Sequence, residues 1–339
     1  MKEKKILVIV GVSLLFLTIG VSAATIIYSA NIISYSNSNL SGSNVQDALD
    51  NLISKYRSIN TACPNGVVCT PKTNIKCKRA TTLHTETCTN SVASYYCQGA
   101  GYALNENITY GNQTIIEGVL TTGDAFDCDV NGDGTFDNAT ERFYYVSDYY
   151  DTSTKNFNDK VAVLIYYSNV RGGVANTSGT AYDSSNQNYN GPVTAKAELP
   201  TTTQWTNIRL YKDTRQILAT NNETAAGGED LPTSFSYAGY SARLLTYQEV
   251  YHGCNSYDKT PTSIGGLEAK CQFLMEGTNF SNISLATSGP WLESPSALNS
   301  FIAYNVDASN RDLGSNCSVN YAYYGTRPTI EILKSEISY

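Results

Sequence analysis

Two runs of β-branched and aromatic residues constrain the fold of this chain more than any other feature. They are Arg142-Phe-Tyr-Tyr-Val146 and Val161-Ala-Val-Leu-Ile-Tyr-Tyr167, with a mostly polar stretch of fourteen residues between them. Val, Ile, Tyr and Phe favour extended backbone, and two such runs joined by a polar connection are typical of neighbouring antiparallel strands. We therefore expect a β-hairpin here, within a strand-rich domain.

A loop with the spacing of calcium ligands leads into the first run. Residues 129–137 read Asp-Val-Asn-Gly-Asp-Gly-Thr-Phe-Asp, and Gly134 would make the sharp turn. The expected ligands of a structural calcium ion are Asp129, Asn131, Asp133, the carbonyl of Thr135, and Asp137. Position twelve, where a bidentate carboxylate is expected, is Thr140, and Glu141 comes one place late. Asx residues and glycine also form turns without a metal, so a plain polar turn is the alternative.

The calcium loop enters a strand rather than a helix. A complete helix–loop–helix EF-hand is therefore not expected, and an ion at this position would rigidify a loop at the entrance to a sheet.

The first residues direct the chain out of the cytoplasm. Met1-Lys-Glu-Lys-Lys5 is basic, and an apolar run follows from Ile6 to about Ile27. Val21-Ser22-Ala23 followed by Ala24 has the small residues that a signal peptidase needs, which favours secretion. About 20 apolar residues are also long enough to span a bilayer, so an uncleaved membrane anchor that holds the chain at the cell surface is the alternative.

Nine cysteines in an exported chain predict disulfide bonds, and their odd number leaves at least one unpaired. They are Cys63, Cys69, Cys77, Cys88, Cys97, Cys128, Cys254, Cys271 and Cys317. Cys254 with Cys271 is the pair we expect most, because it closes a short loop between two helical patterns. A zinc site is the competing interpretation of the first five, but their spacings are wider than zinc sites favour.

Composition excludes one class of partner and favours another. The formal net charge is -7 and only 16% of residues are charged, so no basic patch exists to bind nucleic acid. The 26 tyrosines, with abundant Ser, Thr, Asn and Gly, are typical of secreted β-rich proteins and binding modules. Tyrosines that alternate in half-buried strands would explain the same composition structurally.

A short helix is expected after the export segment. Ser43-Asn-Val-Gln46 has a capping-box pattern, and Val45, Leu49, Leu52 and Tyr56 form one apolar stripe. Two heptads are too short for a stable coiled coil by themselves. The sequence of residues 44–52 resembles a segment of bacterial surface proteins and phage tail fibres that begins a trimeric stalk. The resemblance implies a homotrimer; a helix docked on its own domain or a spacer above the membrane is the alternative.

The remaining patterns divide the chain into four parts. We expect a signal peptide or membrane anchor at 1–27, a lead-in and short stalk helix at 28–57, a cysteine-rich segment at 58–100, and an α+β domain at 101–339. Within the last part we expect polar loops at 168–192 and 211–234, a short helix at 194–199, a strand running into a helix capped by Thr246 and Glu249 at 242–250, a helix at 271–275, a tryptophan loop at 289–295, and strands at 301–306 and 325–333.

The closing motifs resemble a group of surface proteins. Trp291-Leu-Glu-Ser-Pro295 and Gly325-Thr-Arg-Pro-Thr-Ile330 are similar to the "GYWTSTP" loop and final "GVRPVI" strand of uncharacterised surface proteins from low-GC Gram-positive gut bacteria. Their closing domain resembles the fold shared by formylglycine-generating enzymes and C-type lectins. The resemblance covers about 105–335 and implies a C-type-lectin-like, mostly antiparallel α+β domain with short helices and long loops. Arg327 is expected to be a buried or edge arginine that organises the last strand.

No catalytic motif accompanies these patterns. His84 and His252 have no convincing partner, and the dedicated cysteine pair of formylglycine-generating enzymes cannot be matched here, so that activity is not carried over. Glu249 and Glu293 are the carboxylates that a glycosidase would use, since such enzymes need only two carboxylates a few ångströms apart. Glu249 also has a structural explanation, as a helix-capping residue.

The expected role is therefore non-enzymatic, adhesin-like binding of a glycan or protein on another cell surface. The ligand-contacting residues expected on the loop face are Trp291, Glu293, Tyr182, Tyr323 and Tyr324. Trp291 as a core residue is the competing interpretation. A structural component of a surface appendage or fibre is the first alternative function, and an extracellular glycoside hydrolase is the less favoured second.

Overall fold

The computed structural model describes one compact unit within Lys72–Tyr339. The described ranges are 74–87, 105–112, 119–176, 178–220, 229–254, 271–275, 277–278, 283–284, 289–307 and 312–339. The export segment, the stalk helix and most of the cysteine-rich segment lie outside them. Within these ranges, no helix has the length and apolar character needed to cross a membrane.

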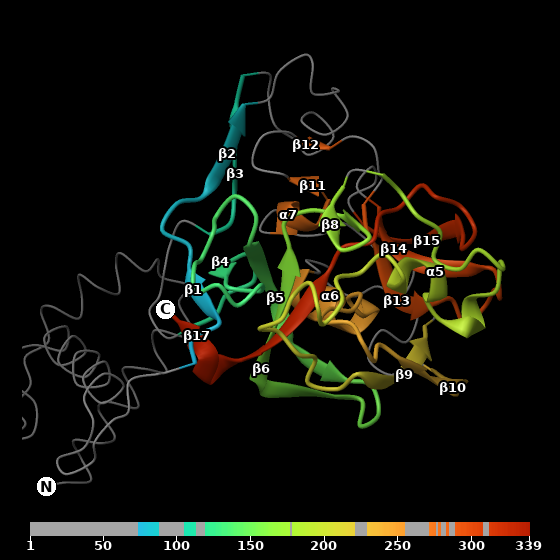
Figure 1. Cartoon of the computed structure of the whole chain (residues 1–339). Helices are drawn as coiled ribbons and strands as arrows, with labels where there is room; N and C mark the ends of the chain where they lie inside the picture. Colours follow the sequence, from blue (N-terminus) through green and yellow to red (C-terminus); the bar gives the residue numbers. More distant parts are fainter. Residues whose placement is uncertain are drawn as a thin grey trace, which may run out of the picture. The chain divides into compact units, whose positions relative to one another are not determined.

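A six-stranded sheet forms the centre of the unit, in the order β16-β6-β5-β4-β1-β17. Its strands are β1 (Cys77–Arg79), β4 (Ala125–Cys128), β5 (Arg142–Asp151), β6 (Asn156–Tyr166), β16 (Thr329–Leu333) and β17 (Ile337–Ser338). Neighbours are antiparallel except β1 and β17, which are parallel. The first described strand and the last therefore lie side by side at one edge (Figure 1).

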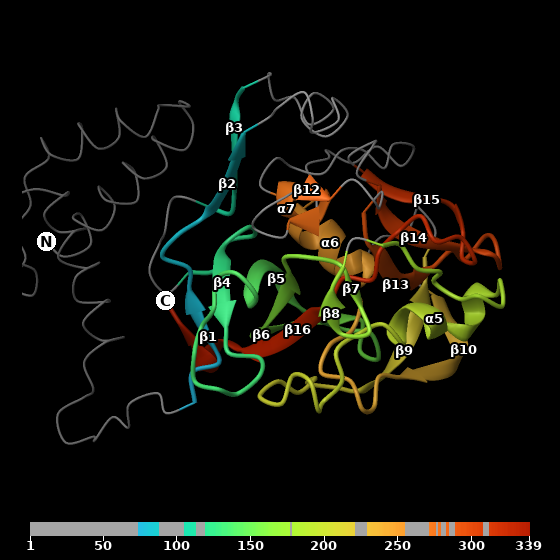
Figure 2. The same ribbon diagram turned by 45° about the horizontal axis from the view of Figure 1, so that its top comes forward.

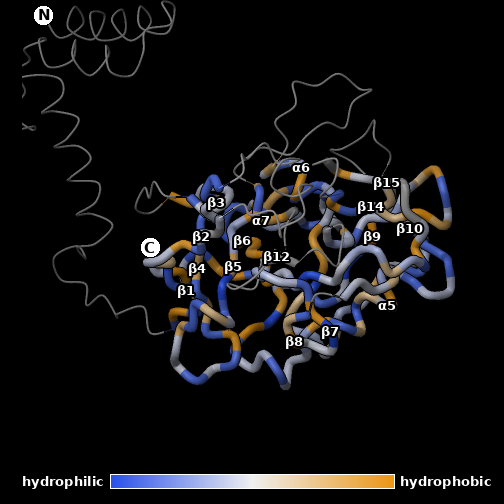
Figure 3. The backbone as a smooth tube through the Cα atoms, turned by 90° about the horizontal axis from the view of Figure 1, so that it is seen from above, coloured by the Kyte–Doolittle hydropathy of each residue, from blue (hydrophilic) through white to orange (hydrophobic). Residues whose placement is uncertain are grey.

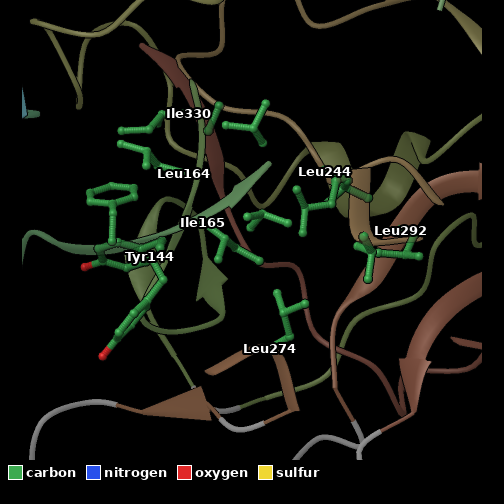
Figure 4. Packing of buried hydrophobic residues seen from close by; sticks show 14 of the residues in the cluster. Tyr144, Leu164, Ile165, Leu244, Leu274, Leu292 and Ile330 are labelled. Atoms are coloured by element: carbon green, nitrogen blue, oxygen red, sulfur yellow. The ribbon is translucent and has the colours of Figure 1, made fainter. Parts of the chain in front are cut away.

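The predicted hairpin is confirmed as β5 and β6. Both strands are longer than the apolar runs, and the register pairs Phe143 with Tyr166. Residues 161–166 are all buried, because a continuous apolar run suits a strand covered on both faces. Figure 4 shows Leu164 close to Ile330 of β16, whereas Ile165 lies toward Leu244.

Smaller sheets accompany the main sheet. The end of the unit away from β1 and β17 holds β13 (Trp291–Pro295) with β14 (Ile302–Asp307) and β15 (Asp312–Ser318), and β9 (Thr214–Ala219) with β10 (Glu229–Ser236) (Figures 1 and 2). Two further pairs of two-residue strands are β7 (Val170–Arg171) with β8 (Val174–Ala175), and β11 (Gly277–Thr278) with β12 (Ile283–Ser284). The ladder of β2 (His84–Thr87) and β3 (Asn107–Tyr110) extends away from the main sheet in both views. The short helices are η1 (Asn188–Asn190), α5 (Val193–Lys196), α6 (Tyr247–Cys254), α7 (Gln272–Met275) and η3 (Lys334–Glu336).

Three predictions of loops are wrong in part. The stretch 168–192 contains the two-residue strands β7 and β8, the stretch 211–234 contains β9 and most of β10, and 289–295 contains the buried strand β13. Gly and Pro at the ends of 289–295, and Asn and Gly in the middle of 211–234, concealed a short apolar centre in the strand. For β13 that centre is Trp291-Leu292, and for β9 it is Ile217-Leu218.

The helix predicted to follow Thr246 is confirmed as α6, whereas the strand predicted before it is not formed, and Arg243 makes only an isolated bridge to Thr329. The Thr246 hydroxyl accepts a hydrogen bond from the Glu249 amide at 3.1 Å, and the Glu249 carboxylate accepts one from the Thr246 amide at 3.0 Å. This reciprocal pair is the predicted capping box. Arg327 is buried and donates to the carbonyls of Tyr166 and Tyr167, so it joins the start of β16 to the end of β6.

Two disulfide bonds lie within the described residues. The expected Cys254–Cys271 bond joins the end of α6 to the start of α7. The second, Cys77–Cys128, joins residues that face one another on β1 and β4. Since β1 is an inner strand of the main sheet, part of the segment 58–100 belongs to the same unit as the strands that follow it.

The described residues form a strand-rich α+β domain with mostly antiparallel sheets and few helices. This agrees with the expected fold class at the level of its architecture.

Candidate functional site

Three of the five residues expected on a ligand-binding face form one buried aromatic cluster. Tyr182, Trp291 and Tyr324 are between 0% and 3% exposed. The ring centroid of Trp291 lies 4.8 Å from that of Tyr324 and 5.8 Å from that of Tyr182. The Trp291 indole donates to the carbonyl of Thr180 at 2.8 Å, and the Tyr182 hydroxyl donates to that of Glu293 at 2.7 Å. These rings therefore join the loop at 180–182 to β13 and to the loop that precedes β16, and all three are buried inside the protein.

Tyr323 is different, because 61% of its surface is exposed. Its ring centroid lies 5.6 Å from that of Tyr321, which is 52% exposed. Three further large apolar side chains are exposed on loops that adjoin this one. We call the five together the tyrosine surface: Tyr189, Leu298, Phe301, Tyr321 and Tyr323.

Asn188, the neighbour of Tyr189, fixes its own loop to the turn that carries Leu298 and Phe301. Its side-chain amide donates to the carbonyls of Ser296, Asn299 and Ile302 at 2.6–3.0 Å, and its backbone amide donates to that of Ser300. One buried amide thus shapes the whole turn between β13 and β14, on which Leu298 and Phe301 stand. Local sequence patterns do not reveal this, because the contacts join residues more than 100 positions apart.

The loop that carries Tyr321 and Tyr323 is fixed at its start through backbone hydrogen bonds. The amide of Val319 donates to the carbonyl of Phe301, and the amide of Asp183 donates to the carbonyl of Val319. Figure 3 shows hydrophobic segments among the loops at this end of the unit, near β10, β15 and α5. Exposed apolar groups gathered on fixed loops are typical of interaction sites, whereas isolated ones are ordinary.

Glu249 and Glu293 do meet in space, but in a buried ionic cluster rather than in a cleft. The cluster consists of Arg215, Arg243, Glu249, Glu293 and Glu331, of which the most exposed is 5% exposed. Arg243 donates to both oxygens of Glu249 at 2.6 and 2.8 Å, and to Glu331. Arg215 donates to Oε1 of Glu293 at 3.1 Å.

The two glutamates differ in how completely they are bonded. Glu249 also accepts hydrogen bonds from the amides of Tyr150 and Thr246. Oε2 of Glu293 is buried and has no hydrogen-bond partner, and neither has the hydroxyl of Tyr237. Burial favours the protonated form of both carboxyls. At Glu249 the attraction of Arg243 overcomes burial and lowers the pKa, whereas at Glu293 burial prevails over Arg215 and raises the pKa.

The ionic cluster is chemically suited to support rather than catalysis. Two arginines balance two carboxylates, Glu249 and Glu331, when Glu293 keeps its proton. A glycosidase needs its carboxylates on either side of a sugar that can enter. Here each is enclosed, and the cluster joins β9, α6, β13 and β16 at their centre.

The segment 129–137 is a turn held by its own hydrogen bonds. Asp129 accepts from the amides of Gly132 and Gly134, and Asp133 accepts from the amide and hydroxyl of Thr135. Gly134 has φ +83°, as the sharp turn requires. Asn131 and Asp137 also accept from nearby amides.

Glu141 holds the base of this turn, because its carboxylate accepts from the amides of Val130 and Asp137. Within the described ranges, no three His, Cys, Asp or Glu side chains are grouped to hold a metal ion. Calcium therefore stays a prediction of the sequence.

The histidines have structural surroundings. His84 stacks on Tyr110, and His252 is exposed and stacks on Phe157 at 4.3 Å. The thiol nearest in sequence to His252 is that of Cys254, which is oxidised to the disulfide. A Cys–His nucleophilic pair is not available at this position.

No protein-family model matches this chain, and no curated protein or solved structure is significantly similar to it. The function is therefore argued from the geometry of the described residues.

Proposed function

We propose that this chain is an exported, surface-displayed binding protein whose macromolecular ligand contacts the tyrosine surface. The ligand is a glycan or a protein on another cell surface, and binding involves no chemical reaction. The observation that carries the proposal is the exposure of five large apolar side chains on loops that Asn188 and the backbone hold in place. Rigid aromatic side chains on fixed loops lose little entropy on binding, and Tyr is enriched at such contacts.

The proposal includes a C-type-lectin-like fold, similar to that of formylglycine-generating enzymes. Support comes from the strand-rich α+β architecture, the adjacent first and last strands, and the long loops gathered at one end. The disulfides support an oxidising, extracellular location, with residues 1–27 as the leader or anchor.

Binding of the full chain to a glycan array and to whole cells tests the proposal. Tyr321→Ala and Tyr323→Ala should each weaken binding by about 1–2 kcal/mol, the usual contribution of a tyrosine at the centre of an interface. The matched control is Phe157→Ala, because Phe157 is an aromatic side chain that is 38% exposed and lies outside the tyrosine surface. Binding that survives the double variant Y321A/Y323A, or a chain that binds neither glycans nor cells, refutes the proposal.

The alternative function is that of a structural component of a surface appendage or fibre. The apolar stripe Val45–Tyr56 that favours it lies outside the described residues. Sedimentation of residues 24–339 decides between the two: a trimer that becomes a monomer when 40–57 is deleted favours the fibre, and a monomer in both favours the binding protein.

A further inference from the structure

A cavity of about 350 Å³ opens between two segments that are not part of the tyrosine surface. One wall is the segment 209–214, and the other is formed by Thr202, Gly239 and Tyr240. The volume falls within the range of roughly 300–1,000 Å³ that small-molecule sites occupy. The cavity is therefore large enough for a small ligand.

Hydrogen bonds to well-ordered parts of the fold fix both walls. The amide of Tyr211 donates to Oε2 of Glu331 at 2.6 Å, which ties the first wall to the buried ionic cluster. The amide of Thr202 donates to the carbonyl of Gly239 at 2.9 Å within the second wall. A site that is formed before its ligand arrives avoids the free-energy cost of ordering loops on binding.

Two tyrosine rings supply apolar contact. Half of the Tyr211 surface is exposed, and its ring is held edge-on by Tyr149 at a centroid distance of 5.4 Å. The Tyr240 ring lies 5.7 Å from the ammonium group of Lys196. A ring held in this way offers a flat apolar surface to the C–H face of a ligand.

The polar lining carries balanced charge. Lys212 is occupied by an ion pair with Asp151 at 2.6 Å. Arg209 donates through one nitrogen to main-chain carbonyls of its own turn, which leaves its other N–H groups for a ligand. The Asp213 carboxylate accepts one long hydrogen bond, at 3.3 Å, from its neighbour Thr214.

One available cation and one available anion suit a ligand with no net charge and with hydroxyl groups that both donate and accept. Together with the two rings, this is the chemistry of a sugar. We infer that the cavity bounded by Arg209, Tyr211, Asp213 and Tyr240 is a binding site for a neutral saccharide unit. The inference concerns residues other than the tyrosine surface and does not depend on the proposed function.

Saturation-transfer NMR on the full chain tests this site. The probes are the methyl glycosides of glucose, galactose and mannose, and N-acetylglucosamine, with glucose 6-phosphate and glucuronate as charged counterparts. We expect at least one neutral probe to bind at millimolar concentration, more tightly than its charged counterpart. Tyr211→Ala should weaken binding about two- to tenfold, the contribution of one aromatic contact. Asp213→Asn should weaken it about tenfold or more, because a charge-assisted hydrogen bond is lost.

We expect Asp213→Asn to fold like the wild type, because the carboxylate accepts a hydrogen bond only from its neighbour and Asn has nearly the same shape. A loss of binding in this variant would therefore report on the site itself. The control is Phe157→Ala, which removes a ring that is 38% exposed and lies on β6, outside the cavity and the tyrosine surface, and which should leave the affinity for the sugar unchanged. The inference is overturned if no neutral probe binds, if the phosphate or the uronate binds better, or if Y211A and D213N both retain the wild-type affinity. Loss of cell binding in Y321A/Y323A with sugar binding intact separates this site from the proposed function.

Discussion

Glu249 and Glu293 lie in the same buried cluster, yet replacing each by Gln should have very different consequences. The Glu249 carboxylate accepts two hydrogen bonds from Arg243 and two from backbone amides. In Glu249→Gln, an amide group that donates would face the guanidinium, and Arg243 would keep Glu331 as its only carboxylate in the cluster. Breaking a buried ion pair from one side costs about 3–5 kcal/mol, so we expect a loss of unfolding free energy of that size.

Glu293→Gln should lower the unfolding free energy much less. The Oε1 atom still accepts from Arg215, and Oε2 has no hydrogen-bond partner to lose. Burial raises the pKa of Glu293, so the site opposes the charge of this carboxyl, and Gln removes that charge. We expect a change within about 1 kcal/mol, the scale of one ordinary hydrogen bond.

Urea unfolding at pH 7 under non-reducing conditions measures both variants, with tyrosine fluorescence and circular dichroism as two probes of the same transition. The expected result is a large fall in the midpoint for E249Q and a small shift for E293Q. Equal losses in the two variants, or a larger loss in E293Q, would refute the conclusion that the cluster depends more on the charge of Glu249 than on that of Glu293.

Three further predictions concern pH, disulfide bonding and calcium. The pKa of Glu249 is lowered in the folded state, so its contribution to the unfolding free energy is present above the unfolded pKa of about 4.3 and is lost as the pH falls through the folded pKa. The pKa of Glu293 is raised in the folded state, so its contribution is present below about 4.3 and is lost as the pH rises through the folded pKa. The E293Q variant should therefore gain stability relative to the wild type as the pH rises, which urea titrations across that range measure. Cys254→Ser with Cys271→Ser opens a loop of sequence separation 17 and should cost about 3 kcal/mol of unfolding free energy, with peptide mapping of the wild type confirming the bond. Calorimetric titration should find one calcium site with a dissociation constant of about 1 mM or tighter, lost in Asp133→Ala; absence of binding heat in the wild type removes calcium from the loop.

Local patterns predicted the elements whose stabilising contacts are themselves local. The β5–β6 hairpin follows from two apolar runs, and the start of α6 from Thr246 and Glu249 three positions apart. The bond between Cys254 and Cys271 followed from the helical patterns on either side of the loop. In these cases the interacting residues stand close together in the chain, so their spacing carries the information.

The parts that could not be predicted depend on distant contacts. Arg215 and Glu293 are separated by 78 positions, and nothing near either residue marks it as buried. The expected binding residues Tyr182 and Trp291 are buried for the same reason, since their partners come from other loops. Tyr323 was selected on the same grounds as these two, and its exposure depends on how the turn after β15 is held. Burial of a polar or aromatic side chain is decided by topology, which a single sequence does not display.

The position of the Cys77–Cys128 bond has a mechanical consequence. Cys77 begins the first described strand, so a pull on the chain preceding it arrives at this residue before it reaches the rest of the main sheet. The covalent bond passes the load directly to β4 instead of letting the short ladder between β1 and β17 open one hydrogen bond at a time. A domain tethered from its amino-terminal side and held by a ligand at its other end would thus keep its shape under tension, for as long as this one bond stays oxidised.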